Sequence, residues 1–113
     1  MRQNYADLEA QPEIIKKHDA AADAAATATK AANADQFWVV DWITWSYEGG
    51  TPTGNLIVTL GSTTVLDVDI VAAGPGQLIF DKPLYVGTKN EALTITLAAG
   101  GTGVTGKVSA RIR

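Results

Sequence analysis

The chain has 113 residues, no cysteine and a single histidine, His18, which excludes disulfides, thiolate metal sites and a histidine metal cage. Its net charge of −3 is the difference between nine basic and twelve acidic residues spread over the whole length, which argues against a nucleic-acid-binding protein. No stretch of about 18 consecutive apolar residues is present, so we expect no membrane span. We therefore expect no metal, no cofactor, and no nucleic-acid or membrane partner.

Residues 1–19 are polar and carry only four large apolar side chains. They lack the apolar core of a signal peptide, so we expect a protein that is made in the cytoplasm and stays soluble. Pro12 followed by Glu13 suits the first turn of a short helix. The sparse apolar pattern instead favours an N-terminal arm, residues 1–22, that becomes ordered on a partner. The candidate partner-binding residues of this arm are Tyr5, Leu8, Ile14 and Ile15.

Residues 20–34 are mostly alanine, and helix propensity alone favours a helix there. Residues 26–29 nevertheless alternate alanine with threonine, and Asn33 and Asp35 supply turn residues before the next segment. We expect a strand near residues 24–31 that opens a β domain of residues 23–113, with a helix as the alternative.

Residues 37–47 form the longest and most aromatic segment, and this density of β-branched and aromatic residues predicts a strand. Both alternating sets of side chains are apolar, so one face would cover the core and the other would need the arm or another subunit as a cover. The large residues are therefore candidate partner-binding residues, and core filling or stacking on a sugar ring are the alternatives for the tryptophans. These candidates are Trp38, Trp42, Trp45 and Tyr47.

The rest of the chain alternates apolar and polar residues with a period of two, which is typical of half-buried antiparallel strands. Glycine- and proline-rich turns separate these segments, and Gly61-Ser62 is the two-residue connection of a tight hairpin. We predict an all-β protein: a single antiparallel β-sandwich or jelly-roll-like domain of seven or eight strands with an extended N-terminal arm. A core this small without disulfides or metal favours oligomerisation. The alternating segments are 56–60, 66–70, the short strand 78–80, 93–97 and 108–112.

Two features match ligand or catalytic motifs in part. Residues 101–106 read G-x-G-x-x-G and precede Lys107, as in nucleotide-binding loops. However, Val108 stands where a phosphate loop has serine or threonine, and the residues that follow have a strand pattern where both motifs require a helix. We interpret them as a hairpin loop. Asp67 and Asp69 are interpreted as a solvated strand face rather than a carboxylate pair. No base is available to activate a hydroxyl, so we expect no enzyme activity.

Several segments of the chain form a recognisable set: 26–30, Ser46-Tyr47, 52–56, 67–70, 73–76, Phe80 with Pro83-Leu84, and 90–101. Together these segments resemble small β-rich virion proteins of tailed bacteriophages. The resemblance implies a structural role: a capsid decoration (cement) protein that forms trimers, lies on the capsid surface and contacts the major capsid protein or other virion proteins. It also implies that the arm docks on the shell or on an adjacent trimer.

Two alternatives remain open. One is a phage fibre or spike module that binds cell-surface carbohydrate through the tryptophans. The other is a head-completion or tail component, which predicts rings of six or twelve copies instead of trimers.

Overall fold

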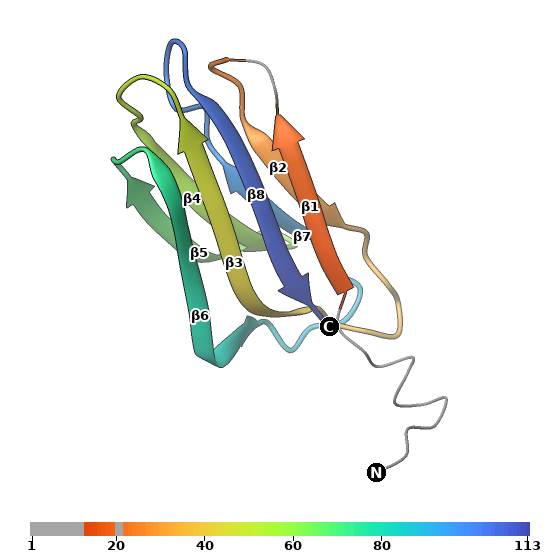
Figure 1. Ribbon diagram of the computed structural model, residues 1–113. Helices are drawn as coiled ribbons and strands as arrows, with labels where there is room; N and C mark the ends of the chain where they lie inside the picture. Colours follow the sequence, from red (N-terminus) through yellow and green to blue (C-terminus); the bar gives the residue numbers. More distant parts are fainter. Residues whose placement is uncertain (1–12, 20–21) are drawn as a thin grey trace.

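The computed structural model describes residues 13–19 and 22–113, which fold into two four-stranded antiparallel sheets packed face to face (Figure 1). Sheet 1 has the order β1-β8-β3-β6 and sheet 2 the order β2-β7-β4-β5. The described part contains no helix, and so none that is long and apolar enough to cross a membrane. The strands are β1 (Glu13–Asp19), β2 (Ala26–Lys30), β3 (Val39–Glu48), β4 (Gly54–Leu60), β5 (Thr63–Ile70), β6 (Gly74–Tyr85), β7 (Leu93–Leu97) and β8 (Thr105–Ile112).

The strand pairing is that of a jelly roll. β4 and β5 form a hairpin, and β3 pairs with β6, β2 with β7 and β1 with β8, so the chain is wound as one long folded hairpin. Further pairings of β3 with β8 and of β4 with β7 join these strand pairs into the two sheets. The predicted all-β sandwich is therefore confirmed, with eight strands.

The prediction of an arm up to residue 22 is wrong for its second half, because residues Glu13–Asp19 form an edge strand of sheet 1. β1 pairs with β8 along its whole length, from Glu13 opposite Ile112 to Asp19 opposite Gly106. Ile15 packs against the core. The β domain therefore includes β1, and no helix follows Pro12. Residues 1–12, with the candidates Tyr5 and Leu8, lie outside the described residues.

The alanine-rich segment is a strand, as predicted. In β2, Ala26 and Ala28 are 0% and 2% exposed and face the core, while Thr27 and Thr29 face outward. β2 pairs in register with β7, whose leucines and isoleucine fill the adjacent part of the core. Tertiary packing thus overrides the helix propensity of alanine.

A β-bulge in β3 corrects the expectation of a strand with two apolar faces. The register with both neighbouring strands shifts between Val40 and Trp42, so one extra residue, Asp41, reverses the alternation. Before the bulge, Trp38 and Val40 are buried; after it, Ile43 and Tyr47 are buried. Most of the apolar side chains therefore reach a single core, and Trp42 is the large apolar residue of this strand that β3 turns outward.

The predicted short strand 78–80 is in fact the middle of β6, a twelve-residue edge strand. β6 continues beyond the predicted end, through Asp81, Lys82 and Pro83, to Tyr85. Proline fits there because an edge strand does not need every backbone N–H for a neighbour. Leu78 and Phe80 pack against the core, whereas Ile79 between them is 70% exposed.

Candidate functional site

The eight candidate partner-binding residues do not form one site. Tyr5 and Leu8 are outside the described residues, and Trp38 and Tyr47 are core residues at 9% and 1% exposure. Trp38 donates its indole N–H to the Ala31 carbonyl oxygen at 3.1 Å, with Lys30 Nζ 5.2 Å from the ring centroid. Burial thus removes Trp38 and Tyr47 as partner-binding residues. The other candidates are Ile15 and Trp45, which pack against the core, and Ile14 and Trp42, which face outward.

Strand register brings the two outward candidates into one row across sheet 1. Ile14 lies opposite Arg111, and Trp42 lies between Arg111 and Ile79. We call this set the Trp42 row: Ile14, Arg111, Trp42 and Ile79, one from each strand of the sheet. Ile14 is 54% exposed and Ile79 is 70% exposed. The row therefore presents a partly exposed indole beside a guanidinium, with an exposed aliphatic group on each edge strand.

Next to the Trp42 row, the outer face of sheet 1 is polar. Ser109 and Gln77 lie on either side of Thr44, and the Thr44 and Ser109 hydroxyls are 2.7 Å apart. Lys107 is exposed two residues further along β8. The face thus combines one apolar row with hydroxyl, amide and cationic groups, a composition suited to binding and not to acid–base chemistry.

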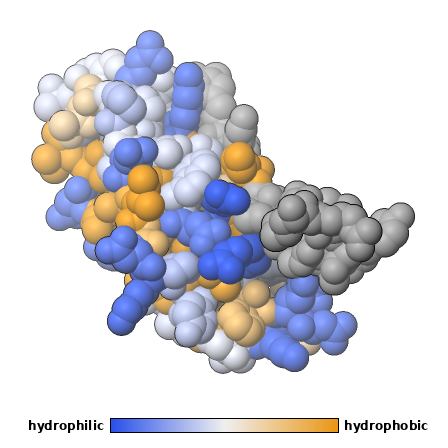
Figure 2. All heavy atoms as spheres, turned by 60° about the horizontal axis from the view of Figure 1, so that its bottom comes forward, coloured by the Kyte–Doolittle hydropathy of each residue, from blue (hydrophilic) through white to orange (hydrophobic). Residues whose placement is uncertain are grey.

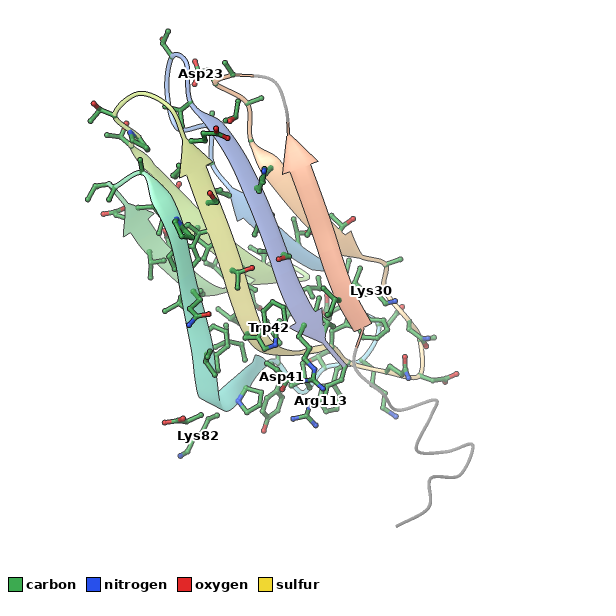
Figure 3. All side chains as sticks on the ribbon, viewed as in Figure 1. Asp23, Lys30, Asp41, Trp42, Lys82 and Arg113 are labelled. Carbon is green, nitrogen blue, oxygen red and sulfur yellow. The ribbon has the colours of Figure 1, made fainter. Side chains whose placement is uncertain are left out.

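The lower end of sheet 1 holds an ion pair and an aromatic pair. Arg113 Nε is 3.1 Å from both carboxylate oxygens of Asp41, the bulge residue, and these side chains lie below Trp42 in Figure 3. Phe37 and Tyr85 stack with ring centroids 5.6 Å apart, and Tyr85 is 57% exposed. Figure 2 turns this end forward and shows apolar side chains interspersed with hydrophilic ones. The Phe37–Tyr85 pair could not be predicted from the sequence, because its members are 48 positions apart and meet through the pairing of β3 with β6.

The outer face of sheet 2 is mostly polar, with carboxylates on one edge strand. Asp67 and Asp69 are exposed on β5, and Asn55 Nδ2 donates to Asp67 Oδ1 at 3.0 Å. Threonines of β2, β4 and β7, together with Ile57, occupy much of the rest of this face. Among the described residues no group of three or more histidine, cysteine, aspartate or glutamate side chains is arranged to hold a metal ion. This placement agrees with the interpretation of Asp67 and Asp69 as a solvated face.

Residues 101–104 are a loop, and Thr105 and Gly106 already belong to strand β8, so the motif is not a phosphate-binding turn before a helix. Gly101 N–H donates to Asp23 Oδ1 at 3.1 Å, and Asp23 N–H donates to the Val104 carbonyl oxygen at 2.8 Å, so these contacts tie the loop to the start of β2. Figure 3 places Asp23 at the upper end of the sandwich, away from Trp42. The nucleotide-binding motif therefore lacks the structural context that it needs.

No protein-family model and no curated protein matches the chain. Among solved structures, the carbohydrate-binding module CBM36 in complex with calcium and xylotriose matches at 12% identity and a TM-score of 0.40, over 79% of this chain and 71% of that one. A family 35 carbohydrate-binding module from an environmental isolate matches at 14% identity and a TM-score of 0.47, over 85% and 70%. The GH26-CBM35 β-(1,4)-mannanase of Podospora anserina matches at 11% identity and a TM-score of 0.46, over 88% and 27%. These low scores transfer no ligand to this chain.

Proposed function

We propose that this chain is a non-catalytic structural protein of a tailed-bacteriophage virion, a capsid decoration protein that self-assembles, in trimers, and binds the shell. The proposal starts from the sequence resemblance to small virion proteins. The observation that carries it is the Trp42 row, which leaves Ile14 and Ile79 exposed on either side of Trp42 and Arg111. Aliphatic side chains gain free energy when a protein surface covers them.

The chemistry of the row favours a protein partner. Tryptophan and arginine are the residue types that most often dominate binding energy at protein interfaces. Here Trp42 and Arg111 are cross-strand neighbours on the two central strands of the sheet, with polar groups next to them. A small domain with no cysteine also gains stability when a second subunit covers such a face.

The experiment measures assembly first and decoration second. The mass of the purified chain should be a multiple of 11.8 kDa, with three copies expected. Particles of the encoding phage prepared without this protein should then bind added protein and become more resistant to heat. A chain that stays monomeric at high concentration and leaves the particles unchanged would overturn the proposal, whereas rings of six or twelve would favour the head-completion or tail alternative.

Carbohydrate binding is the second candidate, and Trp42 supports it in a different way. Its partly exposed indole lies beside the row of Ser109, Thr44 and Gln77, whose hydroxyl and amide groups are suited to hydrogen bonds with a sugar. A glycan array read out with tryptophan fluorescence tests this function. Quenching that is lost in Trp42→Ala but kept in Trp45→Phe would establish a sugar platform, and a flat response across the array would exclude it.

A further inference from the structure

The exposed side chains of the two outer faces differ in charge. On sheet 1, Lys107 and Arg111 of the central strand β8 are exposed, and within the described part of the chain neither forms an ion pair. The exposed acidic residues described in that sheet lie away from β8: Glu48 at the end of β3, and Asp81 two residues beyond Ile79 in the edge strand β6. On sheet 2, Asp67 and Asp69 of β5 are exposed, and the other outward side chains of the sheet are neutral. These neutral residues are Thr27, Thr29, Asn55, Ile57, Thr59, Thr94 and Thr96.

This distribution decides how two copies can meet. A symmetric contact between two sheet 1 faces with its twofold axis near β8 brings Lys107 and Arg111 close to the same residues of the other copy, and a contact between two sheet 2 faces with its axis near β5 does the same with Asp67 and Asp69. Like charges placed together at an interface cost several kcal/mol, roughly, and so disfavour these two arrangements. Contact between unlike faces brings the two cations to the two carboxylates.

We propose that the outer face of sheet 1 is the docking surface for the acidic edge of sheet 2 of a second copy of this chain. This inference rests on the self-assembly in the proposed function and adds which surfaces meet. Asp67 or Asp69 of one copy meets Arg111 of the next beside Trp42, where a guanidinium can hold a carboxylate with two hydrogen bonds. The threonines of sheet 2 surround that contact.

Such a contact is heterologous, since each copy offers a different surface to each neighbour. Repeated copies then close into a ring when the rotation between neighbours allows it. A trimer, like every ring with an odd number of copies, requires a contact of this kind, whereas contact between identical faces stops at a twofold dimer.

Charge reversal tests the pairing. Lys107→Glu with Arg111→Glu, and separately Asp67→Lys with Asp69→Lys, should each weaken association at least tenfold in low salt. The variant with all four substitutions has both faces inverted and should associate as the wild type does. Lys89→Glu, in the segment between β6 and β7 and outside the strands of both sheets, is the control for a change in net charge. Circular dichroism checks that each variant folds, and sedimentation gives its mass.

The results separate the inference from the proposed function. Weak association of both double variants with recovery in the fourfold variant supports the inference. A wild-type oligomer that neither double variant disturbs, a fourfold variant that stays dissociated, or a twofold dimer overturns the inference and leaves self-assembly intact. A monomeric wild type overturns both.

Discussion

Trp42 lies directly opposite Ile79 in the register of β3 and β6, one residue beyond the bulge at Asp41. Without that extra residue the alternation set by Trp38 and Val40 would turn Trp42 inward and Ile43 outward. The bulge therefore decides which large side chain of the aromatic strand reaches solvent. It also places Asp41 within reach of Arg113, which fastens the end of the chain to β3.

The Trp42 row predicts that Ile79 contributes to self-assembly. Ile79→Ala should weaken association by about 1 kcal/mol or more, because it removes exposed aliphatic surface from the proposed contact. Thr102→Ala is the control, since Thr102 is exposed in the loop before β8, outside the strands of both sheets. Sedimentation over a concentration series measures both. Equal effects of the two substitutions would contradict an interface at the row.

The Tyr47 phenol should ionise at a higher pH in the folded protein than in the unfolded chain. Burial raises the pKa of the Tyr47 phenol, and its hydroxyl donates to the Ala98 carbonyl oxygen. The Tyr47 phenol of the folded protein therefore keeps its proton at a pH where the same phenol in the unfolded chain has lost it. This contribution to stability is complete below the unfolded pKa of about 10 and disappears as the pH rises through the folded pKa. Phenolate absorbance titrated with and without Tyr47→Phe checks the assignment; identical curves would refute it.

The close packing of β6 against β3 predicts that Gly76 tolerates no side chain. A Cβ at Gly76 would lie 2.4 Å from the Trp45 ring, so Gly76→Ala should lower the free energy of unfolding by roughly 1–3 kcal/mol. Gly87→Ala is the control, because no atom lies within 4 Å of a Cβ built there. Urea denaturation of both variants measures the difference, and equal stabilities would show that β6 moves away at no cost.

The sequence predicts the regular strands well and the irregular ones poorly. Leu93, Ile95 and Leu97 alternate with threonines because β7 lies inside sheet 2, with one face on the core. In β1, Ile15 packs on the core, and a run of charged residues follows Ile15 in the sequence. The pairing of β1 with β8 comes from backbone hydrogen bonds, which leave no pattern in the sequence.

The candidate site was only partly predictable for a related reason. Trp42 stands out by its type, but a period-two pattern interrupted by a bulge gives no sign of which residues change face. Ile79 and Arg111 become its neighbours through strand pairings across 37 and 69 positions, and such long-range register is not written in either segment alone.

The pairing of β1 with β8 predicts that two N-terminal truncations behave differently. Removing residues 1–12 should leave the sandwich folded, because every strand remains. Removing residues 1–19 also removes β1, exposes the edge of β8 and uncovers the part of the core that Ile15 contacts. Thermal unfolding should therefore occur at a distinctly lower temperature, and the protein should aggregate more readily.

If residues 1–12 serve to dock on the shell, the shorter truncation should keep its oligomeric mass and lose binding to phage particles. Equal thermal stability of the two truncations would show that β1 is dispensable, and full binding by the shorter truncation would remove the docking role of the first twelve residues.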